Sequence, residues 1–114
     1  MTLLLKRAYE PTDANDGFRI LVDRLWPRGV SKSSAHIDLW LKEVAPSTDL
    51  RKWFGHEPSK WKEFRERYFA ELRNNSDALK QITEKTQRGV VTLVYSAKDE
   101  KHNQALALKE YLEK

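Results

Sequence analysis

Apolar side chains are distributed along the chain in two different patterns, one typical of strands and one typical of helices. Nearly continuous apolar runs at residues 3–5, 18–22 and 90–95 predict buried strands, and the last suits the centre of a parallel sheet because only Thr92 interrupts it. Residues 36–42 alternate apolar and polar positions, which predicts a half-buried strand. A helix is the alternative for this region, since four apolar side chains also lie at helical spacing: Ile37, Trp40, Leu41 and Val44.

Helical spacing takes over after residue 46. Ser47 predicts the start of a short helix that Gly55 ends, and Pro58 can open the next helix. The apolar stripe of this second helix consists of Trp61, Phe64, Tyr68 and Leu72.

Two further helices complete the pattern. One is expected to begin at Ser76 or Asp77 and to end by Gly89, and the last to begin near Asp99. Strands that alternate with helices are typical of an α/β fold, so we expect residues 1–114 to form one small three-layer domain with a mostly parallel sheet flanked by helices. Right-handed crossovers then bring the carboxyl ends of the strands to one edge of the sheet.

Composition excludes several classes of chemistry. The 114 residues include no Cys, which excludes disulfides, thiolate catalysis and Cys-ligated zinc. The three His residues lack metal-ligand spacing, so we predict neither a metal nor a cofactor. The N-terminal apolar run is too short for a signal peptide or a membrane span, and we expect a cytoplasmic protein without a membrane partner.

The charge balance is mildly basic. A formal net charge of +4 and a pI near 9.4 permit an anionic partner. Basic and acidic residues are interspersed, however, so solvated helix surfaces explain most of the charges. An anionic small molecule is therefore the favoured partner and nucleic acid a weakly supported one, and the sequence does not indicate an oligomeric state.

The second apolar run ends abruptly in polar side chains around a Pro-Gly turn. Asp23 and Arg24 follow it directly, and Arg28 comes after Pro27 has fixed the turn. A guanidinium offers a planar fork of donors that suits phosphate or carboxylate, so both arginines are candidate ligands of an anion. The alternative is a salt bridge from Asp23 to Arg24 or Arg28 that only holds the turn. Trp26 is expected either to pack or to stack on a ligand ring.

The last strand runs into a second polar loop. Ser96 and Lys98 precede a helix N-terminus, where free backbone N–H groups favour an anion, although Ser96 and Asp99 are also explained as helix caps. His102 is a candidate general acid or base with Asp99 or Asp23 to orient it, and a solvated surface role is the alternative.

Three strings look like the YeaO-like branch of the domain-of-unknown-function 488 family: Asp-Arg-Leu-Trp-Pro-Arg-Gly (23–29), Ile-Asp-Leu-Trp-Leu-Lys-Glu (37–43) and Leu-Val-Tyr-Ser-Ala-Lys-Asp (93–99). The resemblance spans residues 18–111 and implies a compact α/β fold and a cytoplasmic bacterial or archaeal protein, but no established activity. Broader members of the family carry a Cys at the end of the last strand and a Cys-His pair entering the last helix. In this chain Ser96 occupies the position of the Cys at the strand end, and His102 lies near the position of the Cys-His pair. This difference puts a thiol mechanism in doubt for this branch.

The leading hypothesis is a domain that binds a nucleotide or other phosphorylated ligand at the strand ends, with acid/base catalysis as an additional role. The alternatives are a nucleic-acid-binding accessory protein and a protein-interaction domain whose Asp/Arg cluster is structural. The candidate catalytic residues are Asp23, Asp99 and His102, and the candidate ligand-binding residues are Arg24, Trp26, Arg28, Ser96, Lys98 and Asn103.

Overall fold

Four parallel strands form one sheet in the computed structural model, which describes residues 2–114. Their order across the sheet is β1 (Leu3–Arg7), β4 (Val91–Tyr95), β2 (Phe18–Leu21) and β3 (Leu39–Trp40). β4 pairs with β1 on one side and β2 on the other, and all five of its side chains are buried. The predictions of a central last strand and of an α/β fold with a parallel sheet are confirmed.

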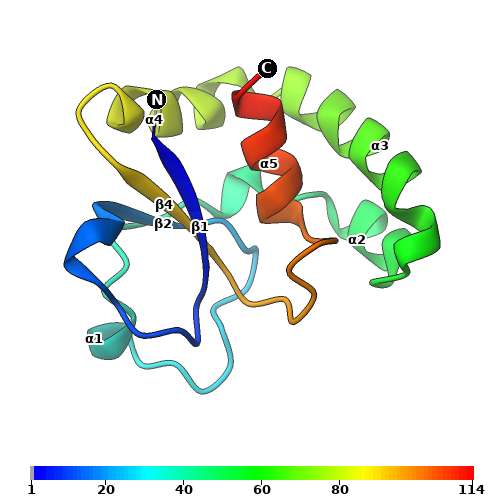
Figure 1. Ribbon diagram of the computed structural model, residues 1–114. Helices are drawn as coiled ribbons and strands as arrows, with labels where there is room; N and C mark the ends of the chain where they lie inside the picture. The colour runs from blue at the N-terminus through cyan, green and yellow to red at the C-terminus, as the bar shows by residue number, and fades with distance from the viewer. Residues whose placement is uncertain (1) are drawn as a thin grey trace.

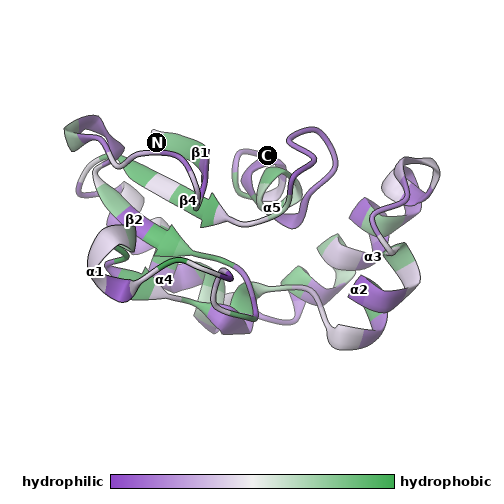
Figure 2. Ribbon diagram, turned by 90° about the horizontal axis from the view of Figure 1, so that it is seen from below, coloured by the Kyte–Doolittle hydropathy of each residue, from purple (hydrophilic) through white to green (hydrophobic). Residues whose placement is uncertain are grey.

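One face of the sheet carries the hydrophobic core. Side chains alternate between the two faces of a strand, so Leu3, Ile20 and Leu93 point to the same side. They pack there against three helices: α3 (Trp61–Arg73), α4 (Ser76–Thr86) and α5 (Gln104–Leu112). Figure 1 shows these helices above the strands, and Figure 2 shows β2 and β4 as largely hydrophobic ribbons.

The opposite face of the sheet has a thinner, more polar cover. It is formed by η1 (Ala14–Asp16) and α1 (Lys32–Ala35), the latter below the strands in Figure 1. The buried Thr92 hydroxyl donates to the Asp16 carbonyl at 2.7 Å, and the buried Arg19 guanidinium donates to the Ala35 carbonyl. The sheet therefore separates an apolar helical layer from a thin polar one, which gives the three layers that the pattern predicts.

The short helix after residue 46 follows the local signals. Helix α2 (Thr48–Phe54) begins after Ser47, whose hydroxyl accepts the Leu50 N–H at 3.2 Å, and it ends at Gly55 in the left-handed conformation. Pro58 begins the 3-10 turn η3 (Pro58–Lys60), which leads directly into α3. These predicted boundaries are confirmed because each depends on a capping residue that acts locally.

The predicted strand at residues 36–42 is mostly wrong. β3 covers only Leu39–Trp40, because the Asp38 carboxylate takes the Arg19 N–H at 2.9 Å and the 3-10 turn η2 (Lys42–Val44) begins immediately afterwards. The short helix α1 just before it has no counterpart in the predictions.

Two helix starts also differ from the prediction. The N-cap of α4 is Asn75 rather than Ser76 or Asp77. Helix α5 begins at Gln104, five residues after Asp99, because the Asp99 carboxylate accepts the N–H groups of the next turn and Asn103 provides the cap. The loop after β4 is consequently longer than predicted, and His102 lies in it rather than in the helix.

No helix within residues 2–114 combines the length and the apolar character that crossing a bilayer requires.

Candidate functional site

The carboxyl ends of β2 and β4 meet where the chain leaves the sheet in opposite directions. After β2 the chain continues to α1 on the polar face, and after β4 it continues to α5 on the apolar face. In parallel sheets, ligands bind in the crevice that such a change of direction opens. A cleft of about 920 Å³ lies here, between the loops after the two strands and helix α2.

Asp23 lies at the floor of this cleft and is buried. Its Oδ2 accepts the Ser96 N–H at 2.9 Å and the Ser96 hydroxyl at 2.6 Å, while its Oδ1 accepts the Gln104 side-chain amide. Burial raises the pKa of the Asp23 carboxyl above its ordinary value, and these donors together with the charge of Arg51 oppose that rise. The Asp23 carboxylate thus ties the loop after β2 to the loop after β4 and to the start of α5.

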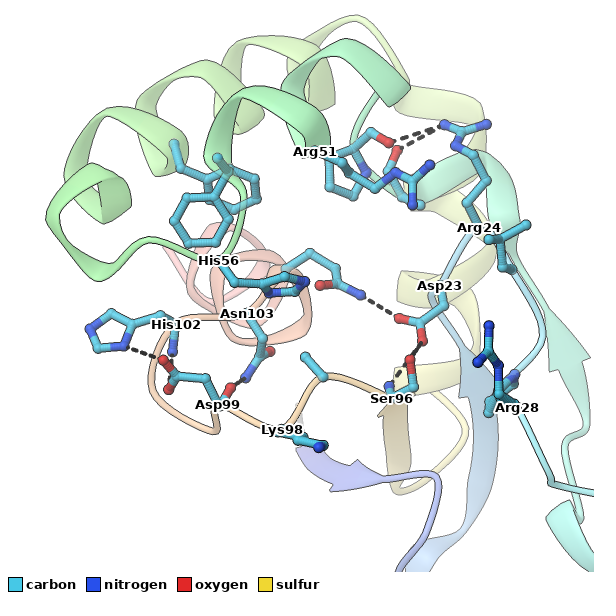
Figure 3. A pocket seen from close by; sticks show the side chains of 18 of the residues that line it. Asp23, Arg24, Arg28, Arg51, His56, Ser96, Lys98, Asp99, His102 and Asn103 are labelled. Atoms are coloured by element: carbon cyan, nitrogen blue, oxygen red, sulfur yellow. Dashed lines mark hydrogen bonds and ion pairs between the residues drawn. The ribbon is translucent and has the colours of Figure 1, made fainter.

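Two arginines approach the cleft from separate elements. Arg24 follows β2 and its Nη2 donates to the Pro46 carbonyl at 3.2 Å, while Arg51 extends from α2 (Figure 3). The Nε atom of each guanidinium is buried and has no hydrogen-bond acceptor within residues 2–114. Figure 3 shows Arg51 pointing toward Asp23. Both arginines line the cleft, whereas Arg65, on α3 outside the cleft, has a buried Nε of the same kind.

The remaining predicted ligand residues of the first loop lie at the mouth of the cleft. Arg28 is exposed, and its carbonyl accepts the Tyr9 hydroxyl at 3.0 Å. Trp26 is half-buried: its indole N–H donates to the Val30 carbonyl at 2.6 Å, and its ring packs edge-on against Trp40. The structure thus brings Trp26 to the cleft, but with its polar atom already engaged.

The loop after β4 supplies the opposite wall. Lys98 is exposed, and the Asp99 carboxylate is 2.8 Å from Nδ1 of His102. Hydrogen bonds from the Lys101 N–H and from His102 lower the pKa of Asp99. Asn103 is buried, and it caps α5 with its side-chain oxygen while its amide donates to the Asp99 carbonyl at 2.9 Å. All nine predicted site residues line this one cleft, with Asn103 engaged in holding the loop.

The proposed salt bridge at the turn does not form. Within residues 2–114, no ion pair of Asp23 with Arg24 or Arg28 is found, and the side chains that donate to the Asp23 carboxylate are the uncharged groups of Ser96 and Gln104. His102 is oriented by Asp99 rather than by Asp23.

The sequence did not indicate four further polar residues of the cleft: Arg51, Lys52, His56 and Gln104. Arg51 and Gln104 lie in ordinary amphipathic helices, where a polar residue normally faces solvent, so no local signal separates them from their neighbours. His56 follows Gly55 at a helix end, which indicated only a polar loop. The feature that could have marked it is its left-handed backbone, with φ of +58°, which is not visible in a sequence.

No cluster of three or more His, Cys, Asp or Glu side chains that could hold a metal ion is found within residues 2–114. The charged lining of the cleft consists of guanidinium and ammonium groups together with the Asp23 and Asp99 carboxylates, which already accept hydrogen bonds.

Comparison with known proteins gives a consistent result. The model of the "Inactive DUF488-N3 subclade" matches residues 2–114. The chain is 45% identical over 112 residues to the uncharacterized protein YeaO of Escherichia coli (strain K12), covering 98% of this chain and 97% of YeaO. It is 42% identical over 106 residues to the uncharacterized protein Rv3073c of Mycobacterium tuberculosis (strain ATCC 25618 / H37Rv), covering 93% and 89% of the two chains. No solved structure matches the chain.

Proposed function

Because this chain belongs to the inactive DUF488-N3 subclade, we propose that it binds a phosphate-bearing ligand in the cleft at the ends of β2 and β4 without converting it. The observation that carries the proposal is the pair of arginines, Arg24 after β2 and Arg51 on α2, that line the same cleft from separate elements. A phosphate bound between the two guanidinium groups would accept charge-assisted hydrogen bonds from them.

The charge of the cleft supports the same proposal. Two carboxylates line it, those of Asp23 and Asp99, and both already accept several hydrogen bonds. Five cationic side chains stand against them: Arg24, Arg28, Arg51, Lys52 and Lys98. A concave site with an excess of one charge raises the local concentration of oppositely charged ligands. Its volume of about 920 Å³ falls within the range of small-molecule sites.

The test is an amide-resolved NMR titration of the labelled protein with inorganic phosphate and with ribose 5-phosphate. We expect shifts to cluster at residues 23–29 and 96–104. Arg51→Ala should weaken binding by about tenfold, since a hydrogen bond to a charged group contributes about 1.5–3 kcal/mol. Arg73→Ala is the matched control, because it removes the same charge from the exposed end of α3.

Equal weakening by Arg51→Ala and Arg73→Ala would show that only net charge matters and would contradict the proposal. An absence of localised shifts in the wild-type protein would contradict it as well. Circular dichroism of each variant checks that the fold is retained.

Acid/base catalysis on the bound ligand is the second candidate, and one observation favours it. The Asp99 carboxylate holds Nδ1 of His102, which fixes the imidazole ring and leaves Nε2 for proton transfer. A time course followed by ³¹P NMR separates the two candidates. Unchanged ligand supports binding alone, whereas conversion that is lost in His102→Gln supports catalysis.

A further inference from the structure

We infer that the ligand of this cleft is a nucleotide, with its phosphate at Arg24 and Arg51 and its base stacked on the imidazole of His56. This inference rests on the proposed function and extends it from a phosphate to a phosphate ester of a planar, ring-bearing molecule. It is carried by the division of the cleft into a cationic half and an aromatic half.

The aromatic half begins at an unusual turn. Gly55 and His56 are consecutive residues in the left-handed region, with φ of +53° and +58°. This conformation is uncommon for a residue with a side chain, and such residues concentrate at functional sites. The turn reverses the chain after α2 and places the His56 imidazole over the cleft, where Figure 3 shows it facing Asn103 and the loop after β4.

A ladder of aromatic rings supports His56 from behind. The Phe54 ring lies 6.2 Å from the His56 imidazole and is stacked on Phe64 at 4.4 Å between centroids. Phe64 is stacked in turn on Trp61, whose ring meets His102 edge-on at 5.5 Å. Because Phe54 and Phe64 are buried, this wall is held in place by the core, and His56 is its exposed end.

The other aromatic rings at the cleft are already engaged. The Arg7 guanidinium lies over the Tyr9 ring at 5.2 Å, and the Tyr9 hydroxyl donates to the Arg28 carbonyl. Trp26 packs against Trp40 and uses its indole N–H within its own loop. Within residues 2–114, the single aromatic neighbour of His56 is Phe54, so a face of the exposed imidazole remains for a ligand ring.

A bare phosphate would occupy only the cationic half of the cleft. A nucleotide complements both halves, because its phosphate matches the guanidinium groups and every base offers a π-face for stacking. The ring-bearing part of the ligand should therefore contribute affinity of its own.

The experiment compares the binding of adenosine monophosphate and ribose 5-phosphate, which carry the same phosphate monoester and differ by the base. Base stacking on an aromatic side chain contributes enough for a difference of about tenfold, and we expect adenosine monophosphate to bind more tightly by this factor. Isothermal titration calorimetry at matched ionic strength measures both dissociation constants.

Variants at position 56 test the stacking partner. His56→Ala should reduce the affinity for adenosine monophosphate to that for ribose 5-phosphate and leave the latter unchanged, whereas His56→Phe should retain the preference. His36→Ala is the matched control, because His36 is exposed, also has a positive φ, and does not line the cleft. It corrects for the strain that an alanine meets in this backbone conformation.

Equal affinities of the wild-type protein for the two phosphate esters would overturn the inference and leave the proposed function standing. A preference for adenosine monophosphate that survives His56→Ala would also overturn it. Absence of binding by either ester would contradict the proposed function itself. Binding of an oligonucleotide alone, with an affinity that falls steeply with salt, would overturn the proposed function and the inference and would indicate nucleic-acid binding instead.

Discussion

Two clusters of Asp and Arg lie on different parts of the same sheet and are built differently. In the first, on the polar face, the Asp16 carboxylate accepts hydrogen bonds from Lys6 Nζ at 3.0 Å and from Arg19 Nη1 at 2.6 Å. Arg19 also donates from Nε and Nη2 to the Ala35 carbonyl. The Asp16 carboxylate also accepts the Asp13 N–H as part of a capping box. Within this cluster each charged group has partners.

In the second cluster, at the carboxyl ends of β2 and β4, the pairing is incomplete. Asp23 is held by the uncharged donors of Ser96 and Gln104, while Arg24 and Arg51 each keep a buried Nε without an acceptor within residues 2–114. The two clusters contain the same residue types. The difference lies in their pairing: Asp16 forms ion pairs with Lys6 and Arg19, whereas within residues 2–114 no ion pair joins Asp23 to Arg24 or Arg51.

The largest expected effect is on the first cluster. Asp16→Asn leaves Lys6 and Arg19 without their shared anion, and breaking a buried ion pair in this way costs about 3 kcal/mol or more of unfolding free energy. Urea denaturation measures the loss. Asp77→Asn, at an exposed position in the first turn of α4, should change stability by less than about 0.5 kcal/mol. Equal losses in the two variants would contradict the assignment of a structural role to the Asp16 cluster.

The second prediction concerns acid. Burial opposes ionisation of Asp16, but hydrogen bonds from Lys6, Asp13 and Arg19 prevail and lower its pKa below the ordinary 3.8. The unfolded chain therefore binds this proton at higher pH than the native protein does, so the stability that Asp16 provides is present above pH 3.8 and is lost as the pH falls through the lowered pKa. Urea titrations at about pH 6 and about pH 3 should show a smaller acid-induced loss in Asp16→Asn than in the wild-type protein. An unchanged slope in that variant would contradict this prediction, and Asp77→Asn should keep the wild-type slope.

A smaller change in stability than that of Asp16→Asn is expected at Asp23. In Asp23→Asn the side-chain oxygen can keep the hydrogen bonds from Ser96, and the Gln104 amide can turn to accept the new N–H, so we expect a cost of about 1 kcal/mol. Removing this carboxylate from a cationic cleft should at the same time strengthen phosphate binding, roughly threefold to tenfold.

Denaturation and calorimetry on the same Asp23→Asn sample test this pair of outcomes. Weaker phosphate binding in a variant that keeps its fold would show that Asp23 itself contacts the ligand. A loss of stability as large as that of Asp16→Asn would indicate that both clusters are structural and would contradict the difference in role between them.

The local features of the fold could be predicted because each depends on neighbouring residues. The β2 and β4 strands follow from continuous apolar runs, and α2 follows from Ser47 and Gly55 at its ends. The site residues of the two loops could be proposed because parallel strands bring their carboxyl ends to one edge. The start of α5 was misplaced because Asp99 and Asn103 are both good caps, and only their hydrogen bonds distinguish them.

By itself, the sequence determined the fold class, the strands at the centre of the sheet and the family to which the chain belongs. It also placed polar residues directly after two of those strands. Only the tertiary structure decided which partner each charged group has. It paired Asp16 with Lys6 and Arg19, and it placed Ser96 and Gln104 as hydrogen-bond donors to Asp23. It also brought Arg51 and His56 to the cleft. The physical reason is that hydrogen-bond satisfaction depends on contacts between segments distant along the chain, and no local pattern of residue types encodes those contacts.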